Sequence, residues 1–275
     1  MNKNAMLSKI KYIFLYIYSI IIIFPLLFIL ISSLKDNEDI FTNPWGLPKV
    51  YHWNTYLQLF QKYGMGIYFL NSLYYSILGC IISIIVCTAA AYAISRLKWK
   101  LSGITLGFLL LGLMIPAHST IIPLFFLSSK IGLKNPKISL ILIFVAFSIP
   151  TSVYILASFM KSIPREMEES AVIDGCSIIG AFIRIITPLL KTPIATVTIF
   201  TFLGIWNDLL FSLVFINKES DKNLQLGIMK FLGSYGSRYG ILLSAIVVSM
   251  LPAIIVYIML QDKIVDGLTA GAVKG

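Results

Sequence analysis

An apolar run near the N-terminus limits what this chain can fold into. The run YIFLYIYSIIIIFPLLFILISSL begins at Tyr12 and contains no charged residue. It is long enough to cross a bilayer as a helix, which needs roughly 20 predominantly apolar residues. Hydrophobic residues make up 58% of the 275 residues and charged residues only 12%, whereas soluble domains carry about 25% charged residues. The bilayer is therefore the predicted solvent for most of the chain.

Five further apolar segments follow, so we predict an all-α membrane protein with six transmembrane helices in one domain, residues 1–275. The predicted spans are 12–33, 71–94, 104–126, 138–160, 193–215 and 241–260. Lys3, Lys9 and Lys11 precede the first span, and one lysine and three acids follow it. Basic residues favour the cytoplasmic side, so the N-terminus is predicted to be cytoplasmic. Six spans then place the loop 161–188 and the tail 261–275 in the cytoplasm as well.

Prolines interrupt two of these predicted spans. Pro116 and Pro123 lie in the third, and Pro150 lies in the fourth. Each removes a backbone donor, and in lipid such a break persists only where protein or a cavity satisfies the freed groups. Two interpretations stay open, namely ordinary kinks in a helix bundle or helices that line a translocation path.

Charge and cysteine usage argue against several other classes. The net charge is +10, but in a membrane protein Lys and Arg anchor helix ends against anionic headgroups, so lipid and not nucleic acid is the expected partner. Cys80, Cys87 and Cys176 have neither a disulfide count nor a metal-ligand spacing, and we interpret them as packing residues. With two histidines and no cysteine cluster, no metal site is expected.

The segment EMEESAVIDG, Glu166 to Gly175, holds four of the twelve acidic residues of the chain. Ser162 can cap a helix, Pro164 is tolerated in its first turn, and early glutamates suit the helix dipole. Gly175 can adopt a positive φ and end the helix. The pattern predicts a short helix of about 11 residues followed by a forced turn.

This helix could lie on the membrane surface or dock into another protein. Surface helices prefer Lys and Arg on their polar side, and acids near anionic lipid are repelled, which favours docking. The small residues Ser170 and Ala171 would allow a close approach to a cleft. Glu169 and Asp174 would then meet basic groups of the partner.

The sequence EESAVIDGCSIIGAFIRIITPLL resembles the Glu-Ala-Ala loop of ABC-importer permeases of the carbohydrate-uptake, maltose-type branch. The residues that match its motif in register are Glu169, Ala171, Gly175, Ile185 and Pro188, whereas Ser170 and Thr187 replace an Ala and a Leu. Three further features of that branch are Ser162-Ile163-Pro164, Trp206-Asn207-Asp208 and the ending GLTAGAVKG from Gly267. The resemblance covers essentially the full length, and its four motifs occur in the expected order.

The resemblance implies a loop that couples the permease to a cytoplasmic ATPase. The implied coupling residues are Pro164, Glu168, Glu169, Ser170, Ala171, Asp174, Gly175 and Pro188. The tail residues implied to reach the ATPase interface are Gly267, Leu268, Thr269, Ala270 and Gly271. The chain has no Gly-x-x-x-x-Gly-Lys-Ser/Thr phosphate loop, so no cofactor is expected here, and ATP and Mg are assigned to the partner. The implied partners are a second homologous permease, two ATPase subunits and an extracytoplasmic sugar-binding protein that docks on the loop 217–240.

Four polar or aromatic residues are candidates for the substrate pathway. Asp208 is a charge within the predicted fifth span, which is costly unless it is paired, near the interface or facing water. Asn207 and Asp208 either face the pathway, where they bind sugar hydroxyls or gate it, or make a structural hydrogen bond to a neighbouring helix. Trp206 either stacks on a sugar or belongs to the interfacial aromatic belt. His118 lies beside the proline break, where packing without a specific function is the alternative.

The predicted function is that of a permease subunit of an ATP-driven carbohydrate importer in the bacterial cytoplasmic membrane. The chain itself is not expected to be an enzyme and has no catalytic residue. An ion-gradient-driven secondary transporter is the alternative, although only Asp208 and His118 could serve as intramembrane relays. A membrane-embedded hydrolase or transferase is a further alternative, for which the spans offer neither paired carboxylates nor a Ser/His dyad.

Overall fold

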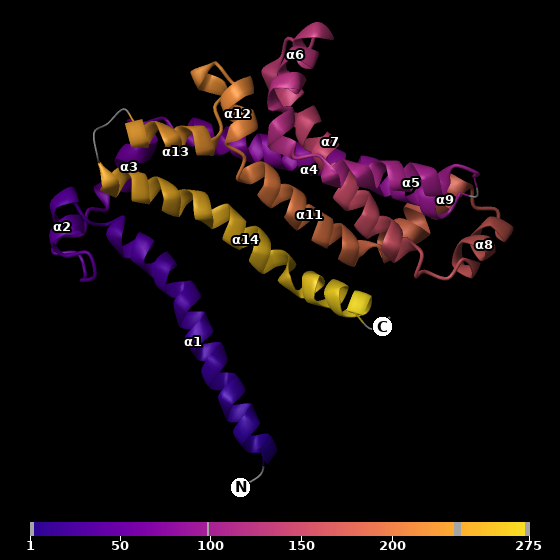
Figure 1. Ribbon diagram of the computed structural model, residues 1–275, viewed down its shortest axis with the longest axis horizontal. Coiled ribbons are helices and arrows are strands. Elements are labelled where there is room, and N and C mark those ends of the chain that lie inside the picture. The colour runs from indigo at the N-terminus through magenta and orange to yellow at the C-terminus, as the bar shows by residue number, and fades with distance from the viewer. Residues whose placement is uncertain (1–2, 98, 234–237, 273–275) are drawn as a thin grey trace. The chain divides into compact units, whose positions relative to one another are not determined.

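The computed structural model describes residues 3–97, 99–233 and 238–272 (Figure 1). Within these ranges the regular elements are helices and no strand occurs. Four helices are long and apolar enough to cross a membrane, and two bent helix pairs would bring the number to six. The prediction of an all-α, multi-pass membrane protein is confirmed, with four to six candidate spans.

The helices vary widely in length. In chain order they are α1 (Lys3–Ser32), α2 (Asn37–Thr42), α3 (Asn54–Gln61), α4 (Met65–Ser95), α5 (Ser102–Leu111), η1 (Gly112–Met114), η2 (Ala117–Thr120), α6 (Ile121–Lys130), α7 (Pro136–Met160), α8 (Glu166–Ile173), α9 (Ile178–Ala181), the π-helical η3 (Phe182–Ile186), α10 (Thr187–Leu189), α11 (Lys191–Trp206), α12 (Leu210–Phe215), η4 (Glu219–Asp221), α13 (Leu224–Gly233) and α14 (Tyr239–Ala272).

The described chain forms two compact units. One comprises the residues up to Gly66 together with Gly227–Leu251. In it, the Ser244 hydroxyl donates a 3.1 Å hydrogen bond to the Ser33 carbonyl, which joins α14 to the end of α1. The loop after α1 is ordered by the Asp36 side chain, which caps α2 by accepting a 2.8 Å hydrogen bond from the Asp39 amide.

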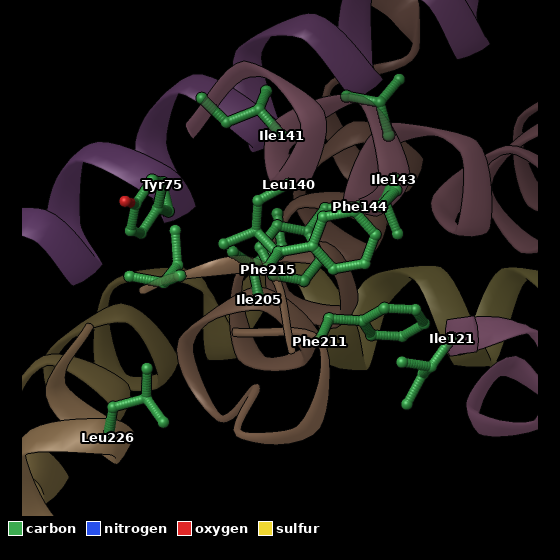
Figure 2. Packing of buried hydrophobic residues seen from close by; sticks show 12 residues of the cluster. Tyr75, Ile121, Leu140, Ile141, Ile143, Phe144, Ile205, Phe211, Phe215 and Leu226 are labelled. Atoms are coloured by element: carbon green, nitrogen blue, oxygen red, sulfur yellow. The ribbon is translucent and has the colours of Figure 1, made fainter. Parts of the chain in front are cut away.

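The second unit, Ile67–Leu226 with Pro252–Gly275, contains the candidate site. One of its apolar clusters joins α4, α7, α11 and α12, and Figure 2 shows Leu140 and Phe144 facing Phe211 and Phe215. A second cluster joins the later turns of α4 and α7 to η3, Leu190 and α11, with Cys87, Val153 and Leu156 fully buried. Lipid is as apolar as these side chains, so close packing rather than water exclusion holds such helices together.

The predicted third span, 104–126, is not one straight helix. The segments Ser102–Met114 and Ala117–Lys130 meet at 90°, and the bend falls at Pro116, as the sequence predicts. Pro123 causes no second break, because it lies in the first turn of α6, where a proline N–H is not needed. The bend brings η1 against α7, and a Cβ on Gly112 would lie only 2.8 Å from Pro150 Cγ, so glycine permits this approach.

The predicted fifth span, 193–215, is also interrupted. Helix α11 ends at Trp206, and α12 starts again at Leu210. At its other end, the segment Ile178–Leu189 meets α11 at an angle of 77°. The π-helical turn η3 lies just before Pro188. The Thr187 amide bonds to the carbonyl of Phe182, five residues earlier, whereas in an α-helix it would bond to the carbonyl four residues earlier. A widened turn of this kind changes the hydrogen-bond register just before Pro188, which has no backbone N–H to donate.

Candidate functional site

The acidic segment folds into helix α8, which is shorter than the sequence predicts. It begins at Glu166 with Arg165 in the N-cap position and no side-chain cap. Ser162 is not the cap, because its hydroxyl donates instead to the Phe159 carbonyl at the end of α7. Pro164 therefore precedes the helix rather than occupying its first turn. The three glutamates do lie in the first turn, where they complement the helix dipole.

The predicted end of the helix at Gly175 is confirmed. Gly175 has a φ of 86°, the left-handed region that favours glycine. Its amide bonds to the Val172 carbonyl at 3.0 Å, and the Cys176 amide bonds to the Ala171 carbonyl at 2.9 Å. These two bonds form a Schellman motif, which satisfies carbonyls that the helix end would otherwise leave unpaired. The Ser177 hydroxyl then caps α9 by accepting from the Gly180 amide at 3.1 Å, so the chain turns in a defined direction.

The acidic side chains of α8 divide between two faces. Glu166, Glu169 and Asp174 are exposed, as are the neighbouring Ser170 and Gly175. Glu168 is different, because only 14% of its side chain is exposed. The outward face thus carries acids beside small residues, the combination that the sequence predicts for docking.

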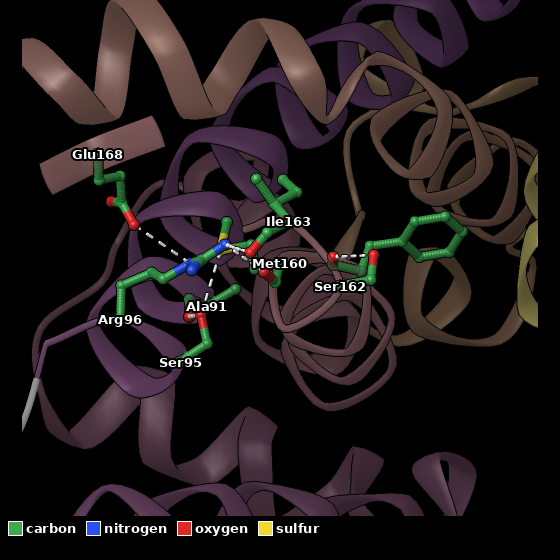
Figure 3. A network of polar contacts seen from close by, with 8 residues as sticks. Ala91, Ser95, Arg96, Met160, Ser162, Ile163 and Glu168 are labelled. Atoms are coloured by element: carbon green, nitrogen blue, oxygen red, sulfur yellow. Dashed lines mark hydrogen bonds and ion pairs between the residues drawn. The ribbon is translucent and has the colours of Figure 1, made fainter. Parts of the chain in front are cut away.

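Glu168 turns inward toward Arg96, which follows the last residue of α4 (Figure 3). The Arg96 Nε lies 3.4 Å from a carboxylate oxygen of Glu168. The Arg96 Nη2 also donates to the carbonyls of Met160 and Ile163, the latter at 2.7 Å. These carbonyls lie at the end of α7, where a positive charge is favourable and the backbone acceptors have no partner within the helix. One buried guanidinium therefore joins α4, α7 and α8.

A second contact links α4 to the segment after α8. The rings of Tyr92 and Phe182 lie 4.7 Å apart, and Tyr92 is one turn before Arg96. Between α4 and α8 an open cavity of about 530 Å³ is lined by Tyr92, Arg96, Arg165, Glu168 and Glu169, among other residues. The end of α4 thus packs against the loop that carries α8.

The other end of α4 holds the loop after α12. Asn71 Nδ2 donates to the carbonyls of Ser220 and Lys222 at 2.8 and 2.9 Å. Asp221 also pairs with Lys137 at the start of α7, at 3.1 Å. Burial opposes ionisation of Asp221, but the hydrogen bond and charge of Lys137 outweigh it and lower the pKa of this carboxyl. From Asn71 to Arg96 a helix extends about 37 Å at 1.5 Å per residue, more than the roughly 30 Å hydrocarbon core. A helix of this length is enough to cross that core.

A cavity of about 330 Å³ lies between η2, α7, α11 and the start of α12. Its lining includes the aromatic rings of Phe144, Phe147 and Phe200. The polar side chains on its wall are His118, Ser148, Thr151, Ser152, Thr201 and Asp208. Apolar faces with a few hydroxyl and charged groups suit a small polar solute that also presents a C–H face.

Asp208 both lines this cavity and caps α12. Its carboxylate accepts hydrogen bonds from the amide and hydroxyl of Ser212 at 2.9 and 2.7 Å and from the Phe211 amide at 3.3 Å. The buried Asn223 donates to the Asp208 carbonyl and to the Ser212 hydroxyl. Asp208 thus makes structural hydrogen bonds, one of the two roles considered from the sequence. Its partners belong to α12, the helix that directly follows it in the chain, and not to a helix packed alongside. This carboxylate satisfies amides of the first turn of α12 that have no partner within the helix, and so stabilises the break between α11 and α12.

The other three pathway candidates lie in different environments. His118 is exposed on the cavity wall, with its ring 6.1 Å from that of Phe211. Asn207 is exposed but does not line the cavity. Trp206 is only 1% exposed and packs between Phe202, which is stacked at 5.6 Å, and Phe69, at 5.7 Å. Its indole ring therefore lies in the interior of the unit and lines neither the cavity nor an exposed surface.

A comparison with known proteins connects these features. Residues 87–269 match the family described as "Binding-protein-dependent transport system inner membrane component". The chain belongs to this family. The match includes α8, the cavity and most of α14. Membership favours a transport subunit over an ion-gradient-driven transporter or a membrane-embedded enzyme.

Relatives of this permease family are similar over nearly the whole chain. The "Probable ABC transporter permease protein YurM" of Bacillus subtilis (strain 168) is 34% identical, with 96% of this chain and 88% of the relative covered. The "Diacetylchitobiose uptake system permease protein NgcG" of Streptomyces coelicolor is 33% identical, with 99% and 91% covered. A chain of a bacterial ABC transporter involved in the import of the acidic polysaccharide alginate has the same fold, with a TM-score of 0.80 at 20% identity over 95% of this chain and 98% of that chain.

Sequence reasoning missed one residue of this permease that the structure brings to α8. Arg96 belongs to a basic stretch that follows the second apolar segment, and such stretches ordinarily anchor a helix end to lipid headgroups. Its position in the sequence gives no signal of the contact with Glu168, 72 residues later. Burial of a charged side chain with backbone and carboxylate partners is visible only in the folded unit.

The remaining predicted residues of this permease are placed as follows. Pro188 is exposed in α10, and Ala171 is half-buried on the inner side of α8. The backbone of Gly267, Leu268, Thr269, Ala270 and Gly271 continues α14 as helix, and the end of the predicted tail, residues 273–275, lies outside the described residues. No group of His, Cys, Asp and Glu within the described ranges could hold a metal ion.

Proposed function

We propose that the chain is the permease subunit of an ATP-driven carbohydrate importer in a bacterial cytoplasmic membrane. It would form half of the translocation pathway with a second, homologous permease. Two separate ATPase subunits and an extracytoplasmic sugar-binding protein would complete the importer. Family membership supports the binding-protein partner, and the diacetylchitobiose named for one relative and the alginate named for a related structure support a carbohydrate.

The exposed face of α8 carries the proposal that an ATPase docks here. The acidic side chains of Glu169 and Asp174 are exposed on it, and the small, exposed Ser170 leaves room for a close approach. The Schellman motif at Gly175 fixes the end of α8, so a force on the helix would not be lost in a flexible turn. Glu169 and Asp174 would meet basic residues of the ATPase, and both termini of the permease would lie on the same cytoplasmic side. Pro164 and Pro188 would bound the segment that moves.

The cavity beside Asp208 is the proposed part of the sugar pathway in this subunit. Sugars need hydrogen-bond partners for their hydroxyl groups and aromatic faces for their C–H groups, and this wall offers both. Asp208 and His118 would be the polar residues nearest the passing sugar. The break after α11 supports this assignment, since irregular backbone at membrane depth is tolerated only where it is buried in protein or faces a water-filled cavity.

The loop after α12 is the proposed dock for the sugar-binding protein. Its first part, residues 217–223, is held by α4 and α7 and presents the exposed Lys218 and Ser220. A prearranged loop would bind with a smaller loss of conformational entropy than a mobile one. The end of α14, Gly267–Gly271, is proposed to reach the ATPase interface on the opposite side.

Affinity purification of the tagged permease from its native membrane tests this function. Peptide identification is expected to recover an ATPase with a phosphate loop, a second permease and a sugar-binding protein. A permease of the same family that lacks acids at the positions of Glu169 and Asp174 would serve as the control for non-specific recovery. Transport by the purified chain alone, driven by an ion gradient without any ATPase, would overturn the proposal.

A further inference from the structure

Helix α8 is poorly anchored for an element that is proposed to carry a mechanical load. None of its residues is buried. It is connected to α7 only through the segment 161–165 and to α11 through the bent segment 174–190. A helix attached in this way would rotate or slide under load unless a side-chain contact fixed it to the transmembrane helices.

Arg96 provides such a contact. Its side chain is only 4% exposed, and its guanidinium reaches the last residue of α7, the turn after α7, and Glu168 of α8. Figure 3 shows the guanidinium lying between Glu168 on one side and Met160 and Ile163 on the other. The planar fork of arginine donates in several directions at once, which the single ammonium of a lysine does less well.

The contact between Arg96 and Glu168 is not fully closed. Among the residues that the structure describes, the buried Arg96 Nε has no hydrogen-bond partner, and the Glu168 oxygen lies at 3.4 Å. A charge-assisted hydrogen bond between such groups is about 2.7–2.9 Å long. A displacement of α8 toward α4 that also aligned the Glu168 carboxylate with the Nε–H would complete this bond. The opposite displacement would leave a buried cation without its carboxylate, which is unfavourable.

We infer that Arg96 is a positioning residue that transmits displacement of α8 to the adjoining ends of α4 and α7. This inference rests on the proposed docking of an ATPase on α8. A push on α8 moves Glu168, the ion pair moves Arg96, and Arg96 carries the end of α7 through its two backbone carbonyls. Helix α7 supplies one wall of the cavity beside Asp208, so the same chain of contacts reaches the proposed pathway.

The test measures access to the cavity in the complete importer, reconstituted in lipid vesicles with its ATPase. A Thr151→Cys reporter on the cavity wall, in a Cys176→Ser background, is labelled with a maleimide with and without ATP and vanadate. The reporter protein with Arg96 intact is the reference for the nucleotide-driven change in labelling rate. Co-purified ATPase and basal ATP hydrolysis are measured in every sample, so assembly is followed separately from transmission.

Arg96→Gln is expected to keep the ATPase bound while reducing the nucleotide-driven change about tenfold, within the range of coupling between distant sites. Arg96→Lys keeps the charge but not the planar fork, so the nucleotide-driven change should be larger than in Arg96→Gln and smaller than in the reference. Lys161→Gln is the matched control, because it removes an exposed positive charge at the same end of α7 and should change nothing. Glu168→Gln tests the same contact from α8 if Arg96→Gln does not assemble, and a loss similar to that of Arg96→Gln is expected.

An unchanged nucleotide response in assembled Arg96→Gln, or in Glu168→Gln, would overturn the inference. A loss caused equally by Lys161→Gln would overturn it too, since the effect would then be one of general charge. A reference protein that retains no ATPase would instead refute the docking proposal on which the inference rests.

Discussion

The hydroxyl of Tyr75 donates a 2.8 Å hydrogen bond to the backbone carbonyl of Asp221, which ties the first half of α4 to the loop after α12. Tyr75 is 1% exposed and belongs to the apolar cluster around α7 and α12. Tyr68, two turns earlier, donates to Glu219 of the same loop. The loop is therefore shaped by side chains of α4 as well as by its own sequence.

Tyr75→Phe is expected to lower the free energy of unfolding of the permease by about 1 kcal/mol. The substitution removes the hydroxyl that satisfies the Asp221 carbonyl but keeps the buried ring. Thermal unfolding in detergent would measure the change. Tyr74→Phe is the matched control, because the neighbouring Tyr74 is 47% exposed and should tolerate the loss of its hydroxyl. Equal effects of the two substitutions would contradict a specific role for the Tyr75 bond.

Gly175→Val is expected to abolish ATP-driven uptake while leaving membrane insertion intact. A Cβ at Gly175 meets nothing within 4 Å, so the penalty comes from its φ of 86° and amounts to about 1–2 kcal/mol. The strain would unwind the end of α8 and displace its docking face. Gly132→Val carries a similar strain at a φ of 77° but lies in the loop after α6. Uptake, normalised to the amount of protein in the membrane, should survive Gly132→Val and not Gly175→Val.

Glu169→Lys is expected to reduce the amount of ATPase that co-purifies with the permease at least about tenfold, because truncating or reversing one partner of an interfacial charge pair costs several kcal/mol. Membrane insertion should be unaffected, since Glu169 is exposed and has no role in the packing of the permease. Glu38→Lys, the same charge reversal at an exposed acid in α2, is the control. Normal recovery of the ATPase with Glu169→Lys would argue against docking on this face.

Asp208 has two roles that substitution can separate. Asp208→Ala is expected to cost about 1–2 kcal/mol of stability, because it removes the acceptor for the first amides of α12. Asp208→Asn keeps one acceptor oxygen and should be closer to the original protein in thermal unfolding. A rise in the KM for uptake in Asp208→Asn, without a loss of stability, would then report the charge on the pathway. Asn207→Ala, at the exposed neighbour, should change neither quantity, and an equal effect there would refute the assignment.

The sequence alone predicted the class of fold and the shape of one functional element. Six long apolar segments can be satisfied only by helices in lipid, because each backbone group must find a partner within its own segment. Gly175 ended α8 as predicted, since a left-handed turn is a local property that depends mainly on the missing Cβ. Capping was harder to place, and Ser162 bonds to Phe159 because the end of α7 competes for its hydroxyl.

Only the tertiary structure decided which distant groups meet. Trp206 could have faced sugar or lipid by sequence, and it packs against Phe69 because α4 lies alongside α11. Glu168 and Glu169 are adjacent acids in one short helix, yet one turns to Arg96 and the other to solvent. Local propensity fixes where a helix begins and ends. Whether one of its side chains is buried in a contact or exposed depends on whether another helix supplies a partner for it. For that reason the sequence determined that an acidic helix exists, and the packing of α4 and α7 decided which of its acids forms an ion pair within the chain.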